Sequence, residues 1–242
     1  MGFFTKVGAF LKRYVYNASW RCNGCGKEIF SEAFFCEGCE KSLPRNGDVV
    51  CNHCGRRVAE HEEYCSTCKS NLISLDKCRS VFSYDGVIKK LVRKAKYDGK
   101  KYILDYFADE LKKLFVKLAW TPDFLVAVPM TVKALRKRGY NQSLVLTQSL
   151  SSKTGVAILD CLSKVKETPN QAKLKRAERI KNLNGVIRVT DKKAVMGKSL
   201  LIVDDVTTTG STAEVIASRL KHAGARQVFL LTVASVPPKD GY

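Results

Sequence analysis

The stretch LLIVDDVTTTGSTA, residues Leu200 to Ala213, decides the fold. An apolar run leads into two adjacent carboxylates, which are followed by threonines, a glycine and further small hydroxyl residues. A short apolar run bounded by polar residues is typical of a buried strand. The residues from about Ser211 to His222, ended by Gly224, predict a helix. The stretch therefore predicts a strand, a loop and a helix in succession.

The loop between this strand and this helix has the composition of an anion site. Ligands of open parallel sheets bind at the carboxyl ends of strands, where Asp204 and Asp205 would lie. The amides and dipole of the following helix favour a phosphate, and Gly210 lets the backbone approach it. Carboxylates beside a phosphate cradle suit a ligand with both a phosphate and a diol. The candidate ligand-binding residues are Asp204, Asp205, Val206, Thr207, Thr208, Thr209, Gly210, Ser211 and Thr212.

Short apolar runs alternate with helical patterns through the rest of the chain. Strands are predicted at SVFSY, FLVAVP, VAILDCL, VIRV, SLLIV and QVFLLTVASV, and further helices at roughly 102–119 and 141–152. This alternation implies an α/β fold, a parallel sheet with helices on both faces. The sequence contains neither GxxxxGK[ST] nor GxGxxG. A chance acidic cap on a helix is the alternative reading of the acid pair.

Eight of the ten cysteines form two copies of the pattern CxxC-x10-CxxC. Four thiolates at this spacing complete a tetrahedral zinc site, and disulfides are the alternative that a reducing cytosol disfavours. We expect one or two structural zinc ions, closed within each repeat or shared between the repeats. Cys78 and Cys161 are expected to be buried small residues, and His53 and His61 are left out as ligands. The candidate ligands are Cys22, Cys25, Cys36, Cys39, Cys51, Cys54, Cys65 and Cys68.

The chain is strongly basic, with 42 Lys and Arg against 23 Asp and Glu and a net charge of +19. Most of the surplus lies after residue 80, and such a field attracts nucleic acid, acidic membranes or phosphorylated metabolites. A helix after Asp85 would bury one apolar stripe and expose cations with no acid among them. It is the leading candidate for a contact surface for nucleic-acid phosphates, with a merely solvated surface as the alternative. The cations are Lys89, Lys90, Arg93, Lys94 and Lys96.

Residues 1–20 predict a basic amphipathic helix that docks on its own protein; the alternative is a helix lying on an anionic membrane surface. The sequence lacks an apolar run long enough to span a bilayer and lacks the pattern of a signal peptide. We therefore expect a cytoplasmic protein, with the inner face of the membrane as the alternative place. The expected organisation is this helix, a zinc module at 21–75 and an α/β domain at 80–242.

VDDVTTTGST resembles the phosphoribosyl pyrophosphate (PRPP) motif of type I phosphoribosyltransferases. The segments VPM…LRKRGYNQS (Val128 to Ser143) and Lys166 to Asn182, with the cysteine repeats, narrow the resemblance to the ComF family of competence-associated proteins. It implies that Asp204 and Asp205 hold ribose hydroxyls and that Thr207 to Thr212 hold the 5-phosphate. Catalytic residues would be this acid pair with Arg136 and Arg138, whose turn, with Gly139, would lie near the pyrophosphate. Segment 166–184 would form a hood through Thr168, Gln171, Arg179 and Asn182.

The resemblance also implies a role in natural transformation, with single-stranded DNA and a helicase-like ATPase as partners and with PRPP bound together with Mg²⁺. One alternative is an active phosphoribosyltransferase that transfers phosphoribosyl from PRPP to a nitrogenous acceptor. A second alternative is an interaction protein that works through its zinc module and keeps an inactive transferase core.

Overall fold

The computed structural model describes residues 21–55, 57–69, 74–166, 185–208 and 210–237. The predicted N-terminal helix and the hood residues Thr168, Gln171, Arg179 and Asn182 lie outside this part of the chain, as does Thr209. The chain divides into two compact units, one ending at Leu43 and the other beginning at Pro44, so the division falls between the two cysteine repeats. Among the described residues, no helix has the length and hydropathy needed to span a bilayer.

The described part of the first unit is built around the first cysteine repeat. Arg21 and Glu28 form an antiparallel bridge across the first CxxC turn, and helix α2 (Glu37–Lys41) begins directly after Cys36. The buried side chains of this unit include those of Phe35 and Leu43. The described part of the unit thus has only a small apolar core. Its stability therefore depends largely on metal binding by the cysteine cluster.

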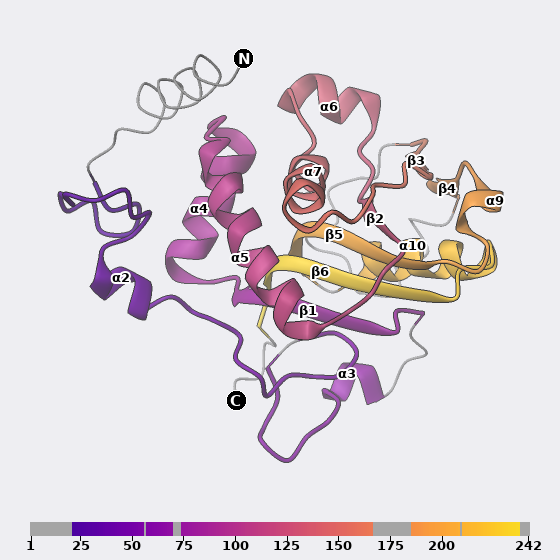
Figure 1. Cartoon of the computed structure of the whole chain (residues 1–242), viewed down its shortest axis with the longest axis horizontal. Coiled ribbons are helices and arrows are strands. Elements are labelled where there is room, and N and C mark those ends of the chain that lie inside the picture. The colour runs from indigo at the N-terminus through magenta and orange to yellow at the C-terminus, as the bar shows by residue number, and fades with distance from the viewer. Residues whose placement is uncertain (1–20, 56, 70–73, 167–184, 209, 238–242) are drawn as a thin grey trace. The chain divides into compact units, whose positions relative to one another are not determined.

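The second unit contains a four-stranded, all-parallel sheet in the order β1 (Lys77–Ser83), β6 (Gln227–Ser235), β5 (Ser199–Thr207) and β2 (Phe124–Ala127) (Figure 1). Because all four strands run the same way, their carboxyl ends lie at one edge of the sheet. The loops that follow the strands therefore meet at that edge, which is where ligands of open parallel sheets bind.

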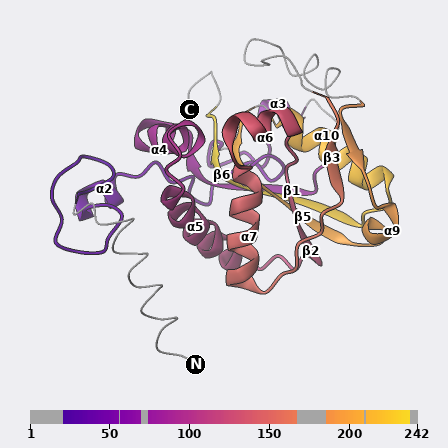
Figure 2. The ribbon, with the colours of Figure 1, turned by 90° about the horizontal axis from the view of Figure 1, so that it is seen from above.

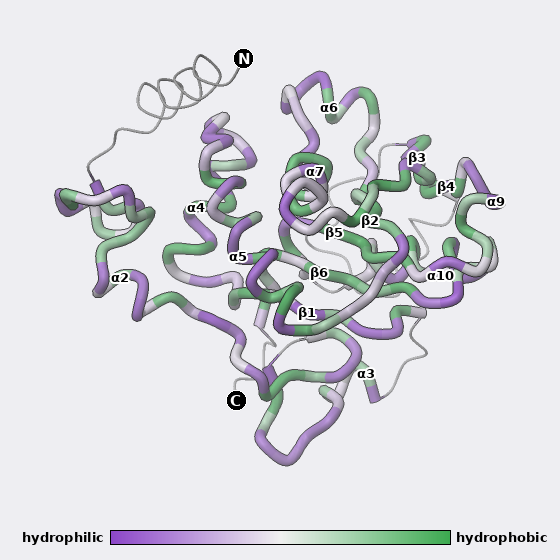
Figure 3. The backbone as a smooth tube through the Cα atoms, in the orientation of Figure 1, coloured by the Kyte–Doolittle hydropathy of each residue, from purple (hydrophilic) through white to green (hydrophobic). Residues whose placement is uncertain are grey.

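Helices cover both faces of this sheet. Alternate residues of β5 point to opposite faces, and Leu200 and Ile202 pack with Ile216 and Leu220 of α10 (Ser211–His222). Helices α5 (Tyr102–Leu118) and α7 (Gln142–Thr154) lie side by side and pack against β5, β6 and β2 (Figure 2). The apolar runs of β5 and β6 lie between these two layers (Figure 3). The predicted α/β class, with helices on both faces, is confirmed.

Helix α4 (Gly86–Tyr97) is capped at its start by Asp85, whose carboxylate accepts from the N–H of Gly86. Ile88, Leu91, Val92 and Ala95 form the buried stripe that the sequence predicts for this helix, whereas Val87, expected in the same stripe, is only half-buried. The short helix α6 (Val132–Arg138) follows β2; Thr131 caps its start, and Gly139, at φ +82°, ends it. The resemblance implies a turn around Arg136 and Arg138, but Thr131 and Gly139 supply start and stop signals that make this segment a helix.

The segment VAILDCL is not one strand. Its first half pairs with β2 only at Ile158, and β3 (Leu162–Lys164) begins at its last residue and pairs antiparallel with β4 (Ile187–Val189). The short helix α9 (Lys192–Val195) follows β4. The apolar run thus serves two sheets, because Leu162 turns inward against β4 and the α10 layer.

The second cysteine repeat lies in the second unit, together with α3 (Ser66–Lys69). Asn46 fixes the start of this unit, since its amide nitrogen donates to Ser80 O, Phe82 O and Ser235 Oγ at 3.2, 2.9 and 3.1 Å. Arg45 adds an ion pair of 2.5 Å with the buried Glu110 of α5. The chain is therefore attached to β1, β6 and α5 before the second repeat begins.

Candidate functional site

The acid pair lies within the last residues of β5 rather than after it. Asp204 is half-buried and Asp205 is buried, and the strand continues to Thr207 because β6 pairs with it up to Ser235. Both carboxylates are held at the edge where the parallel strands end. The sequence predicts this edge correctly, but it predicts a strand that stops before the acids.

Two donors share one oxygen of the first acid. The hydroxyl of Ser143, in the first turn of α7, donates to Asp204 Oδ1 at 2.5 Å, and the N–H of Asp205 donates to the same atom at 2.8 Å. Burial, together with the neighbouring charge of Asp205, raises the pKa of Asp204 to about 6, against its ordinary value of 3.8. Two acids held this close are costly for folding, which is typical of a site built for a ligand.

Lys96, predicted as an exposed cation of the nucleic-acid surface, instead points inward to the acid pair. Its ammonium lies 2.8 Å from Asp205 Oδ2, and only 23% of its side chain is exposed, whereas Lys89, Lys90, Arg93 and Lys94 of the same helix are exposed. Burial would lower the pKa of Lys96, but the charges of Asp205 and Asp204 outweigh it and raise that pKa above its usual value. Lys96 follows Val92 by four residues, so it borders the buried stripe and turns inward.

Arg138 and Gln142, from the segment Val128 to Ser143, lie near the acid pair. Arg138 Nη1 donates to Gln142 Oε1 at 2.9 Å, and the guanidinium lies 5.8 Å from the centre of the Tyr97 ring. Gln142 directly precedes Ser143, whose hydroxyl donates to Asp204, so the hydrogen bond to Gln142 holds Arg138 near the acid pair. Gln142 Nε2 is buried and has no hydrogen-bond partner among the described residues. Arg136, predicted beside it, is exposed on α6.

The predicted phosphate loop is shorter than expected. Val206 and Thr207 belong to β5, Thr208 lies between strand and helix, and Ser211 and Thr212 open α10. Gly210 precedes the helix at φ +76° and, without a side chain, cannot cap its first amides. The N–H groups at the start of a twelve-residue helix, beside small hydroxyls, fit an anion.

Each cysteine repeat closes its own cluster. Cys22, Cys25, Cys36 and Cys39 form one group and Cys51, Cys54, Cys65 and Cys68 the other, with the sulfurs of each group within 4.8 Å of one another. Sulfurs of a tetrahedral zinc site lie roughly 3.8 Å apart, since Zn–S is about 2.3 Å. Cys25 and Cys36 Sγ are 3.8 Å apart, and Cys54 and Cys65 Sγ are 3.6 Å apart. The donor sets therefore fit two zinc ions.

Backbone amides support the thiolate form of the first ligand. Gly24 and Cys36 donate their N–H groups to Cys22 Sγ at 3.3 and 3.2 Å. Burial raises the pKa of the Cys22 thiol, but these hydrogen bonds outweigh it and lower that pKa to about 6. The remaining predictions for cysteine are confirmed, since Cys78 and Cys161 are buried and, among the described residues, both clusters consist of cysteines alone.

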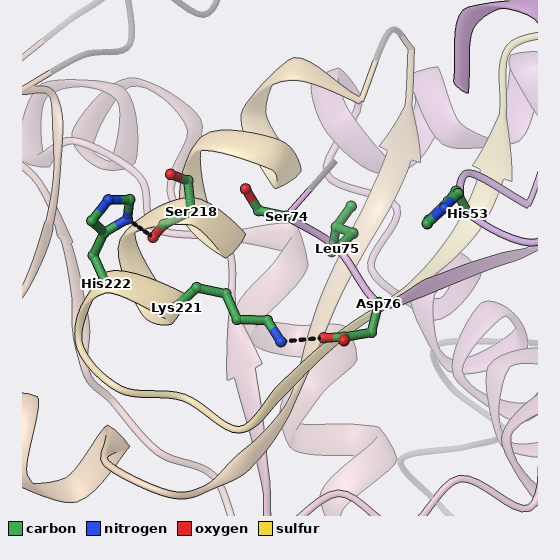
Figure 4. Close-up of a pocket in the computed structure, with 7 residues that line it drawn as sticks. All are labelled: His53, Ser74, Leu75, Asp76, Ser218, Lys221 and His222. Atoms are coloured by element: carbon green, nitrogen blue, oxygen red, sulfur yellow. Dashed lines mark hydrogen bonds and ion pairs between the residues drawn. The ribbon is translucent and has the colours of Figure 1, made fainter. Parts of the chain in front are cut away.

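A pocket of about 430 Å³ lies at the opposite edge of the sheet from the acid pair (Figure 4). It opens where Asp76 precedes β1 and where α10 ends, and the ion pair between Lys221 Nζ and Asp76 Oδ2, 2.7 Å long, crosses it. These two charges inside it are thus already paired. It is lined by His53, Ser74, Leu75, Asp76, Ser218, Lys221 and His222.

Residues 13–69 match the model of the double zinc ribbon domain. The chain is 28% identical to competence protein F of Haemophilus influenzae over 86% of this chain and 81% of that protein. It is 26% identical to competence protein ComFC of Bacillus subtilis, over 60% of this chain and 58% of that protein. It is 36% identical to the DNA utilization protein YhgH of Escherichia coli K12, over 44% of this chain and 47% of that protein.

The chain spans about half to two thirds of the length of the first curated relatives that it matches. Among solved structures, it is similar to a glutamine PRPP amidotransferase from B. subtilis, with a TM-score of 0.39 and 20% identity over 54% of this chain and 26% of that chain. The zinc ribbon match agrees with the two four-cysteine clusters. The chain is therefore similar to competence proteins of the ComF type, with a match to the double zinc ribbon in its N-terminal part and a parallel α/β core after it in the chain.

Proposed function

We propose that this protein binds PRPP at the carboxyl edge of its sheet and takes part in DNA uptake by binding single-stranded DNA. The observation that carries the PRPP proposal is the acid pair on β5, followed within a few residues by the start of α10. Asp204 and Asp205 would accept from the ribose hydroxyls, and the amides and hydroxyls from Thr208 to Thr212 would hold the 5-phosphate. Carboxylate oxygens are also ligands that Mg²⁺ prefers, and Mg²⁺ would neutralise charge on the diphosphate.

Calorimetry with PRPP and Mg²⁺ tests this proposal. Wild-type protein should show saturable binding, and Asp204→Asn/Asp205→Asn should lose it. Folded, zinc-loaded wild-type protein that shows no binding would contradict the proposal. Thermal melts establish whether the double variant folds, because it relieves the repulsion between the two carboxylates but removes the partner of the Lys96 ammonium.

The pH dependence of stability provides a control for that variant. Since the pKa of Asp204 is higher in the folded protein than its ordinary value, the folded state binds this proton more tightly. The resulting stability is present below about pH 4 and is lost as the pH rises to about 6. Asp204→Asn should therefore raise stability at pH 7, on the order of 1 kcal/mol, in thermal melts. Binding lost in the single variant Asp204→Asn, a more stable protein, is not a consequence of unfolding.

The outer face of α4 supports the DNA part of the proposal. Lys89, Lys90, Arg93 and Lys94 are exposed, and Tyr97, 70% exposed, ends the same helix. Cations that contact phosphates beside an aromatic ring on which a base can stack are typical of single-strand binding. The relatives named for competence and for DNA utilization agree with this role. Contact with a competence ATPase and with the inner face of the membrane remains an expectation of the resemblance.

Affinity for single-stranded DNA should fall with salt, by roughly 0.7 in log K per unit of log salt for each phosphate contact. Neutralising Lys89, Lys90, Arg93 and Lys94 to Gln should flatten this slope. The matched control neutralises four exposed cations of other elements, Lys112, Arg188, Lys192 and Lys193. A slope near zero in the wild type, or equal slopes in the two variants, would argue against the α4 surface.

Turnover of PRPP is the second candidate function. Arg138, close to Lys96 and the acid pair, could neutralise a leaving pyrophosphate, and Gln142 Nε2, which has no partner among the described residues, offers a further buried donor. Release of pyrophosphate from PRPP, measured across a panel of nitrogenous bases, tests this candidate. Arg138→Ala should abolish any release that is found, whereas Arg136→Ala, on the exposed face of α6, should change it little.

A further inference from the structure

The last turn of α4 is fixed against the acid pair by contacts that do not involve charge. The hydroxyl of Tyr140 donates to Ala95 O, and Ala95, Val92 and Leu91 are buried. Tyr140 itself is buried and belongs to the segment that leads from α6 into α7, which also supplies Ser143 to Asp204. Lys96 therefore reaches Asp205 from a backbone that is already in place.

The charges at this place cancel. Asp204 and Asp205 supply two negative charges, and Lys96 and Arg138 supply two positive ones. Without the ammonium, an anionic ligand would approach two carboxylates across a partly buried space, where like charges repel more strongly than in water. A bound divalent cation commonly neutralises such carboxylates. Here the Lys96 ammonium already lies 2.8 Å from Asp205 Oδ2.

We propose that Lys96 is a ligand-binding residue of this site. Its ammonium occupies the position beside Asp205 that a divalent cation would otherwise take, and it acts there as a counter-ion. By neutralising this charge, it lets the acid pair accept hydrogen bonds from a sugar diol next to a phosphate. This inference rests on the proposed binding of PRPP. It goes beyond that proposal because it assigns Lys96, on a helix before the acid-pair strand, to the site. It also gives Lys96 a different role from that of the four exposed cations of α4, which are proposed to contact DNA.

The test compares Lys96→Met with Lys94→Met, which removes the same charge from an exposed position two residues earlier on the same helix. Two quantities are measured by calorimetry: the affinity for Mn²⁺ alone, and the affinity for PRPP over a series of Mg²⁺ concentrations. Lys96→Met should bind Mn²⁺ at least tenfold more tightly than the wild type, because the acid pair loses its competitor. It should bind PRPP at least tenfold more weakly at low Mg²⁺ and recover as Mg²⁺ rises.

Three results would overturn the inference: Lys96→Met that behaves as Lys94→Met does in both measurements, tighter binding of PRPP in Lys96→Met, or unchanged affinity for Mn²⁺. Lys96→Arg, which keeps the cation, should resemble the wild type in both. Thermal melts identify variants that do not fold, and Lys96→Gln replaces Lys96→Met in that case. If wild-type protein fails to bind PRPP, the proposed function fails, but the Mn²⁺ measurement still decides whether Lys96 is the counter-ion of the acid pair.

Discussion

The two cysteine repeats have the same spacing but different surroundings. In the first repeat, Cys22 is buried, Cys36 and Cys39 are half-buried and Cys25 is exposed, within a unit that ends at Leu43. In the second, Cys51 and Cys68 are buried with Val58 in a small apolar cluster, inside the unit that holds the parallel sheet. Spacing determines which thiols share a metal, whereas the surrounding chain determines what that metal stabilises.

Contacts with β1 account for this difference. The turn after Cys54 lies against the strand so closely that a Cβ on Gly55 would be 2.5 Å from Cys78 O and 2.9 Å from Arg79 Cα. Gly26, at the same place in the first repeat, has a similar positive φ, and a Cβ there would meet nothing within 4 Å. The second zinc site is therefore part of the fold of the core, and the first is a module with its own stability.

Loss of metal should affect the two units very differently. Cys51→Ser/Cys54→Ser should destabilise the core by roughly 4 kcal/mol or more, which corresponds to about 10 °C in Tm for a unit of this size. Cys22→Ser/Cys25→Ser should leave the core transition within about 2 °C of the wild type. Scanning calorimetry with zinc analysis tests this, and each variant should lose one of two zinc ions. Equal losses of Tm would show that both repeats stabilise the same core.

The glycines distinguish backbone strain from steric contact. Gly26→Ala should cost about 1 kcal/mol, because alanine disfavours a positive φ. Gly55→Ala adds the clash with Cys78 and Arg79 to the same strain, so we expect a loss of about 3 kcal/mol or more. Denaturant unfolding of both variants measures the difference. A similar loss in both would mean that β1 shifts to accept the methyl group.

Features that depend on neighbours in sequence could be predicted. Strand, loop and helix around Asp204, and the membership of both clusters, follow from local patterns and from ligand spacing. The extension of β5 to Thr207 could not be predicted, because it requires β6 as a partner up to Ser235. Nor could the closing of each repeat on its own metal, since CxxC spacing fits either arrangement.

Lys96 shows the same limit within the candidate site. Its spacing from Val92 places it at the border of the buried stripe, where a lysine side chain can turn outward or inward. The inward direction depends on Asp205, more than a hundred residues later in the chain. The charge pattern of α4 alone therefore predicts four surface cations correctly and the fifth wrongly.

A chelator should remove the zinc of the first cluster faster than the zinc of the second. A chelator reaches the first cluster through the exposed Cys25, whereas none of the four cysteines of the second cluster is exposed, so release of its metal requires local opening of the second unit. We expect zinc release in two phases of equal amplitude that differ at least roughly tenfold in rate, since about 1.4 kcal/mol of opening free energy suffices for that factor. A colorimetric zinc indicator follows both phases. Cys22→Ser/Cys25→Ser should lack the fast phase; if it lacks the slow one, the assignment of phases is reversed.

The smallest expected effect concerns the arginine behind the second cluster. Arg79 Nη1 donates to Cys78 O at 2.9 Å and to Cys51 O at 3.4 Å, so the side chain connects β1 with the first ligand of the second site. Arg79→Ala should cost about 1 kcal/mol in the free energy of unfolding, typical for hydrogen bonds from a charged donor. Arg21→Ala is the matched variant in the first repeat, where Arg21 forms an exposed ion pair of 3.8 Å with Glu28. Such a pair contributes little, so the loss there should stay below about 0.3 kcal/mol. If both variants lose the same small amount, the hydrogen bond to Cys51 contributes nothing measurable, and the close contact of Gly55 with β1 remains as a link between the second metal and the sheet.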